Sequence, residues 1–133
     1  GGALGKRMYL RVEDIYTNKK APKVLPHQSI PEVIFEISSK RMGSAAVINE
    51  TNELLGIITD GDLRRMLEKN TDFNTLSACD IMTKTPKTIS PQDMAVAAFE
   101  LMEQNSITQL AVVDKGIYKG MLHLHDLLKE GIV

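Results

Sequence analysis

The sequence is poor in several features that define common protein classes. Its 133 residues include a single cysteine, Cys79, and no tryptophan. One cysteine cannot form an internal disulfide, which excludes a secreted disulfide scaffold. Because only three tyrosines and three phenylalanines are present, we do not expect an aromatic pocket for a large flat ligand. No apolar run reaches the roughly 18–20 residues of a membrane span, and no signal peptide is visible, so we expect a cytoplasmic protein.

The sequence also lacks a large net charge of either sign. Sixteen Lys and Arg residues face 17 Asp and Glu residues, which gives a formal charge of −1. This balance argues against nucleic-acid binding and against adhesion to anionic membranes. The charge is unevenly distributed, since residues 1–23 carry a net +4 and the remainder carries −5. The 43% apolar content is typical of a globular domain.

An internal repeat is the strongest feature that is present. Residues in the first half recur in the same order 64 to 66 positions later. The matched pairs are Asp14-Ile15 with Asp80-Ile81, Pro22-Lys23 with Pro86-Lys87, Phe35-Glu36 with Phe99-Glu100, Ala46-Val47 with Ala111-Val112, and Gly56 and Asp62 with Gly120 and Asp126. The constant order and nearly constant spacing indicate two copies of one structural unit.

Both copies have the same expected order of elements: strand, helix, strand, strand, helix. In the first copy the strands are predicted at 23–25, 45–48 and 54–59, with helices beginning near Ser29 and Gly61. In the second copy the strands are predicted at 87–89, 110–113 and 118–123, with helices opened by Ser90-Pro91 and near His125-Asp126. One such unit cannot cover both faces of its sheet. We therefore predict a mixed α+β fold in which two half-domains pack through their sheets about a pseudo-twofold axis.

The segment from Gly56 to Leu63 is the best candidate for a binding site. An apolar strand ends at the hydroxyl of Thr59, the chain turns at a glycine, and a helix begins with Asp62. A threonine hydroxyl and the backbone N–H groups of a helix start suit a phosphate, while an ionised carboxylate can accept both hydroxyls of a ribose. The simpler alternative is that Asp60 or Asp62 only caps the helix.

The second copy repeats this pattern with one change. Asp126 matches Asp62, but His123 stands where Thr59 stands, so the two candidate sites are not equivalent. Histidine can also donate to phosphate, more strongly when it is protonated. In the first copy, Arg65 shares a helix face with Asp62 and is a candidate clamp for a phosphate or carboxylate. The alternative for Arg65 is a solvated helix surface.

Catalytic and metal chemistry find little support. His123, His125 and Asp126 are close in sequence, but a structural zinc site needs about four ligands, and nothing in the sequence brings Cys79 or His27 near them. We therefore predict no metal site and no catalytic residue. Cys79 is best interpreted as a small buried thiol rather than a nucleophile.

The repeat and the Gly-x-x-Thr-x-x-Asp pattern together resemble a cystathionine-beta-synthase (CBS) domain pair, or Bateman module. Asp14 to Thr17 and Asp80 to Thr83 are similar to the opening signature of that family, and Gly56 to Leu63 to its closing signature. The resemblance implies that Thr59 and Asp62 contact the phosphate and ribose of an adenine nucleotide, with Asp126 as the second aspartate. His123 departs from the usual Ser or Thr. The expected division is a linker at 1–10, repeats at 11–69 and 79–133, and a connecting segment at 70–78.

A narrower resemblance is to the arabinose-5-phosphate isomerases of the sugar-isomerase (SIS) type. It is carried by Gly1 to Arg7, Asp60 to Arg65 and Leu122 to Leu128. The resemblance implies a parent isomerase of the Kdo and lipopolysaccharide pathway whose catalytic SIS domain precedes this segment. The segment itself would then not be an enzyme, and residues 1–10 would be the remaining linker.

Two functions follow from these resemblances. In the first, the pair is a regulatory module that binds a nucleotide or nucleotide-sugar, either AMP or ATP or CMP-Kdo, without an obligatory cofactor. In the second, it is a structural module without a ligand. Its expected protein partners are its own SIS domain and a second copy, as a homodimer through CBS pairs and a higher oligomer in the parent.

Overall fold

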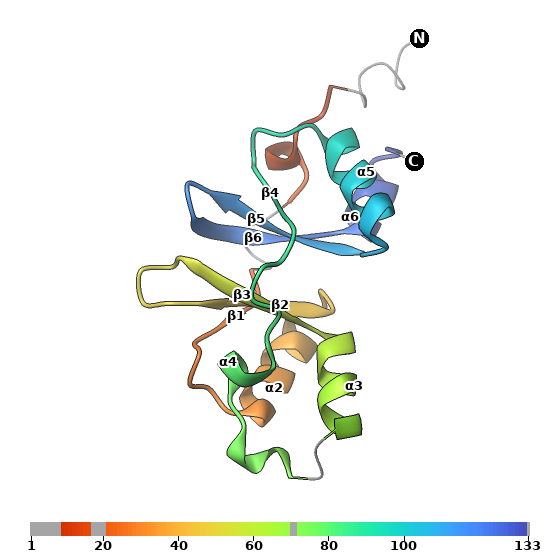
Figure 1. Cartoon of the computed structure of the whole chain (residues 1–133). Helices are drawn as coiled ribbons and strands as arrows, with labels where there is room; N and C mark the ends of the chain where they lie inside the picture. Colours follow the sequence, from red (N-terminus) through yellow and green to blue (C-terminus); the bar gives the residue numbers. More distant parts are fainter. Residues whose placement is uncertain (1–8, 17–20, 70–71, 133) are drawn as a thin grey trace.

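The computed structural model describes residues 9–16, 21–69 and 72–132, which form two similar halves (Figure 1). The first half contains β1 (Lys23–Val24), α2 (Ile30–Lys40), β2 (Ser44–Ile48), β3 (Leu54–Thr59) and α3 (Asp60–Lys69). The second contains β4 (Thr88–Ile89), α5 (Ala95–Asn105), β5 (Gln109–Asp114), β6 (Ile117–His123) and α6 (Leu124–Lys129). The described residues also form three short helices: η1 (Val12–Asp14), η3 (Phe73–Thr75) and α4 (Ala78–Ile81). Across the described residues, no helix combines the length and apolar character of a membrane span.

The two sheets have identical topology, which confirms the predicted fold class. In each sheet the middle strand pairs in parallel with the first and antiparallel with the third. The registers also correspond, since Lys23 pairs with Ala46 in one sheet and Thr88 with Ala111 in the other. Both middle strands contain a register shift at the same place, after Val47 and after Val112. The sequence repeat is therefore a repeat of structure.

Local sequence signals define the boundaries of α2. The Ser29 hydroxyl oxygen caps its N-terminus by accepting the Glu32 N–H. The Glu32 carboxylate accepts the Ser29 N–H in turn, which completes a capping box. Pro31 fits the first turn because it has no N–H to leave unpaired. Arg41 then ends the helix in the left-handed conformation, as Ser106 ends α5.

The start of α5 differs from the prediction. Ser90-Pro91 was expected to open this helix, but they lie in a turn and α5 begins only at Ala95. The reason is a contact distant in sequence: Arg11 forms an antiparallel bridge with Met94, and the Ala95 N–H donates to the Leu10 carbonyl. Because Met94 pairs in an extended conformation with the N-terminal segment, the helix begins only at Ala95.

The short helix at the start of each repeat packs against the opposite half. Val12 of η1 is fully buried among core residues of the second half, and its N–H donates to the Asp93 carbonyl. Ala78 of α4 is buried in the core of the first half, and the Cys79 N–H donates to the Pro26 carbonyl. Figure 1 shows α4 beside α2. The repeats in the sequence and the packed halves in space therefore do not coincide. Residues 1–8 of the predicted linker, and Thr17 of the predicted opening signature, lie outside the described residues.

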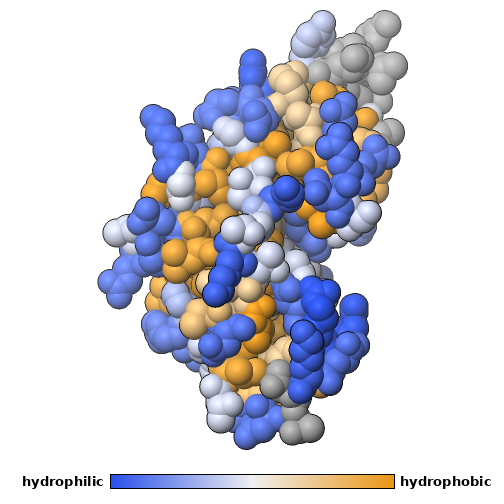
Figure 2. Space-filling model, viewed as in Figure 1, coloured by the Kyte–Doolittle hydropathy of each residue, from blue (hydrophilic) through white to orange (hydrophobic). Residues whose placement is uncertain are grey.

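The two sheets meet through a shared apolar core. It combines side chains from both halves: Met42, Ala46, Ile48, Ile57, Ala111, Tyr118 and Met121. The Tyr118 hydroxyl crosses the interface and donates to the Pro22 carbonyl at 2.8 Å. Burial raises the pKa of Tyr118 far above its usual value, so this hydroxyl remains a donor. Apolar surface, orange in Figure 2, reaches the outside near the middle of the molecule.

Gly56 allows one close crossing of the chain, and its replacement tests that packing. A Cβ at Gly56 would lie 2.7 Å from both the Met82 sulfur and the Thr83 carbonyl oxygen. We expect Gly56→Ala to lower the free energy of unfolding by about 1–3 kcal/mol, as overpacking does. The matched control is Gly61→Ala in α3, where the nearest atoms, at 3.4 Å, belong to the flexible Arg65 side chain. Urea denaturation should show the control to be neutral or slightly stabilising, and an equal loss in both variants would contradict this assignment.

Candidate functional site

Thr59 and Asp62 form a reciprocal cap at the start of α3. The Thr59 backbone N–H donates to Asp62 Oδ2 at 2.9 Å, and the Asp62 N–H donates to Thr59 Oγ1 at 3.2 Å. The Thr59 hydroxyl also donates to Asp62 Oδ2. Because these bonds satisfy backbone groups at the helix start, the simpler alternative from the sequence, a capping role for Asp62, is present in the structure.

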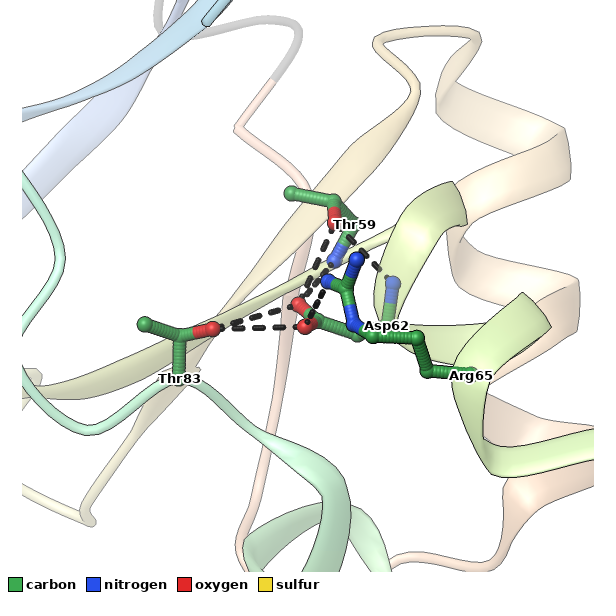
Figure 3. Close-up of polar contacts among 4 residues, drawn as sticks. All are labelled: Thr59, Asp62, Arg65 and Thr83. Carbon is green, nitrogen blue, oxygen red and sulfur yellow. Dashed lines mark hydrogen bonds and ion pairs between the residues drawn. The ribbon is translucent and has the colours of Figure 1, made fainter. Parts of the chain in front are cut away.

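The Asp62 carboxylate has two further partners, drawn in Figure 3. Arg65 Nη2 donates to Asp62 Oδ1 at 2.7 Å, and the Thr83 hydroxyl lies 3.3 and 3.4 Å from the two carboxylate oxygens. Asp62 is only 8% exposed, whereas the Arg65 side chain is 60% exposed. Removing the partner of a buried charge leaves that charge uncompensated, which costs more than the loss of an ion pair between two exposed groups. The guanidinium can therefore leave Asp62 only when other donors take its place.

These residues border two cavities at the junction of the halves. One, of about 300 Å³, is lined by Thr59, Asp62 and Arg65 of the first half, by Thr83 and Lys87 of the segment that joins the halves, and by Gln109 of the second half. The second, of about 440 Å³, shares Thr59, Arg65 and Gln109 with it and adds Asp60, Gly61 and Arg64. The structure thus brings together three of the predicted site residues, Thr59, Asp62 and Arg65.

His123 and Asp126 form a second, separate group at the start of α6. The His123 N–H donates to Asp126 Oδ2 at 2.8 Å, as Thr59 does to Asp62. The cavity beside them, of about 260 Å³, is lined by Arg41, Met42, His123, His125, Asp126 and Lys129. It shares no lining residue with the cavities around Thr59. The five predicted site residues therefore fall into two places.

The His123 ring acts as a helix cap in its neutral form. Its Nδ1 accepts the His125 N–H at 3.0 Å, and the two rings lie edge to face with centroids 4.5 Å apart. Burial is the main cause that lowers the pKa of His123, the charge of His125 lowers it further, and Asp126 opposes both. The structure therefore favours a neutral His123 whose unprotonated Nδ1 accepts the His125 N–H.

Several residues around the cavities were not predicted. Lys129 follows Asp126 as Arg65 follows Asp62, so the repeat spacing of 64 could have identified it. Thr83 reaches Asp62 only because its segment pairs with Ile57 of β3. Gln109 enters through the contact of the halves, where Gly43 makes room for it: a Cβ at Gly43 would lie 2.7 Å from Gln109 Nε2. No local signal in the sequence indicates these last two contacts.

Metal and thiol chemistry remain without a structural site in the described part of the chain. No group of three or more His, Cys, Asp and Glu residues there could hold a metal ion. Cys79 is half-buried in α4, with its sulfur 3.3 Å from the Ser77 hydroxyl, and it lines neither candidate site.

The cap formed by His123 predicts a pH dependence of stability. Because folding lowers the pKa of His123, the unfolded chain takes up a proton first as the pH falls below about 6.5. The free energy of unfolding should therefore keep its highest value above that pH. Below it, the free energy should decline by up to about 1 kcal/mol as the cap is lost. Thermal unfolding from pH 8 to 5 should show a smaller decline for His123→Asn. The control His27→Asn, at an exposed loop position, should decline like the wild type; equal slopes in all three proteins would contradict this role of His123.

Comparison with known proteins follows the two repeats. The CBS domain family matches residues 12–69 and 78–132. The arabinose 5-phosphate isomerase KdsD of Francisella tularensis is 46% identical over 130 residues, which are 96% of this chain and 39% of that protein. The corresponding Yersinia pestis protein is 38% identical over 134 residues, 100% of this chain and 41% of that protein. The chain thus spans about two fifths of the length of these curated relatives and matches their C-terminal CBS region.

The fold is also found in solved structures. A CBS domain protein from Pyrobaculum aerophilum, solved in complex with AMP, superposes with a TM-score of 0.80 at 22% identity. The alignment covers 93% of this chain and 100% of that one. With both repeats matched in sequence and the whole described fold matched in structure, the chain belongs to the CBS domain family, as a tandem pair.

Proposed function

We propose that this chain is the regulatory ligand-binding CBS pair of an arabinose-5-phosphate isomerase. The observation that carries the proposal is the convergence of Thr59, Asp62 and Arg65 on cavities whose other wall belongs to the second half. A ligand there contacts both halves at once, so it favours one arrangement of the pair over others. A differential affinity of this kind is what regulation of an attached domain requires.

The chemistry of the cavities favours a nucleotide or a nucleotide-sugar. The Thr59 hydroxyl and the start of α3 suit a phosphate, and the Asp62 carboxylate suits the hydroxyls of a ribose. Volumes of about 300 and 440 Å³ fall in the range of small-molecule sites, roughly 300–1,000 Å³. An adenine nucleotide is supported by the AMP complex of the Pyrobaculum protein. CMP-Kdo is the second candidate, because its acid group would suit Arg65.

The activity of the parent protein is part of the proposal. The relatives are isomerases, and this chain corresponds to about two fifths of their length. We propose that the remaining part contains the SIS catalytic domain and that residues 1–10 form the linker to it. The CBS pair, with repeats at 11–69 and 79–133 joined by 70–78, would then modulate isomerisation without performing it.

Exposed apolar side chains support a second role in self-association. Ile34 and Phe35 on α2 are 41% and 72% exposed, and Leu67 on α3 and Leu128 on α6 are about half exposed. Such side chains on the outer helices could pack against a second copy. A homodimer of CBS pairs is compatible with ligand binding, and without a ligand it becomes the structural alternative.

Thermal unfolding with candidate ligands tests the proposal. We expect AMP, ATP or CMP-Kdo to stabilise the chain, by about 2.7 kcal/mol at 100 times the dissociation constant. Asp62→Asn keeps the size of the side chain but removes its charge, and it should weaken binding about tenfold if a charge-assisted bond is lost. Asp126→Asn is the matched variant of the second site.

The outcomes separate the two functions. A ligand that Asp62→Asn weakens and Asp126→Asn does not supports the site around Thr59. The ligand-binding function would be rejected if none of the three ligands stabilised the chain. If sedimentation velocity then showed a dimer that forms as the concentration rises, the structural role would be the remaining function.

A further inference from the structure

Arg65 holds the carboxylate that the proposed function assigns to a ribose. Its Nη2 lies 2.7 Å from Asp62 Oδ1, while Thr59 donates twice to Oδ2 and Thr83 reaches both oxygens. Figure 3 shows the Arg65 side chain extending from α3 over this carboxylate. The hydroxyls of a bound ribose would therefore have to replace the guanidinium.

The guanidinium is placed to exchange Asp62 for another anion nearby. Both of its terminal nitrogens lie 3.4 Å from the position that a Gly61 Cβ would take, and Thr59 Oγ1 lies 3.5 Å from the same point. The side chain is 60% exposed and lines both cavities at the junction of the halves. A small rotation can thus turn it from Asp62 to an acid group held beside Thr59.

The balance of hydrogen bonds decides which ligands can make this exchange. A bond between two charged groups is about twice as strong as one between neutral groups. A neutral nucleoside replaces the bond from Arg65 with bonds from hydroxyls and gives the guanidinium no new partner. A ligand with a phosphate or carboxylate takes over the guanidinium, so one charge-assisted bond is replaced by another.

Resting on the proposed function, we propose that Arg65 is a specificity-determining residue that excludes neutral nucleosides. It pairs with Asp62 and releases it only to ligands that combine a vicinal diol with an acid group. Arg64 provides a natural comparison, since it lines one of the same cavities but has no hydrogen bond or ion pair with any described residue. Lys129, three residues after Asp126, is likewise not paired with that aspartate among the described residues.

Matched pairs of nucleotide and nucleoside test this role. Isothermal titration calorimetry would compare AMP with adenosine and CMP with cytidine, in an Asp126→Asn background that removes the charge of the second site. We expect Arg65→Met to reduce the preference for the nucleotide by about tenfold or more, through weaker nucleotide binding and unchanged or tighter nucleoside binding. Arg65→Lys, which keeps the charge but not the planar fork, should lie between Met and wild type.

A charged residue outside the cavities provides the control. Lys119→Met, at an exposed position of β6 that lines none of these cavities, should leave the ratio of nucleotide to nucleoside affinity within about threefold of wild type, because only an exposed charge is lost. Nucleotide binding with a ratio that Arg65→Met does not change would overturn the specificity role but keep the proposed function. Absence of binding by both nucleotides in every protein, including the one with Asp126 intact, would overturn the specificity role and the nucleotide site together.

Discussion

The structure depends on the burial of both faces of each three-stranded sheet. All five residues of β2 are buried. Ala45 and Val47 face the helices of their own half, while Ala46 and Ile48 face the core shared with the other sheet. A single half would leave this second face in water, at a cost of about 25 cal/mol per Å² of apolar surface. Neither half can therefore be stable in this form without its partner.

This packing also creates the candidate site. β3 ends at Thr59 where the two halves meet, so α3 begins against residues of the second half. Gln109 at the start of β5 and the segment with Thr83 supply groups that the strands and helices of the first half lack. Under the proposed function, a ligand in these cavities would contact both halves, and its binding would be linked to their relative arrangement.

The pseudo-twofold symmetry makes the differences between the two sites informative. At Asp62 the carboxylate is held by Arg65 and Thr83. At Asp126 the capping group is a histidine whose pKa is lowered by burial and by the charge of His125, and whose Nδ1 accepts the His125 N–H. The same backbone thus supports one start of a helix where an arginine pairs with the aspartate and one where the cap, a histidine, is lost as the pH falls below about 6.5. The two helix starts therefore differ in the groups that surround the aspartate.

The sequence alone determined what depends on local spacing and on the repeat. The order of strands and helices and the contact of Thr59, Asp62 and Arg65 follow from neighbours within a few residues, because caps and i,i+3 pairs form locally. The tertiary structure decided the rest: the delay of α5 by the pairing of Arg11 with Met94, the crossing of η1 and α4 to opposite halves, and the approach of Thr83 to Asp62. Each of these contacts joins segments more than 20 residues apart, and their pairing is set by the packing of the two sheets, which no local pattern encodes.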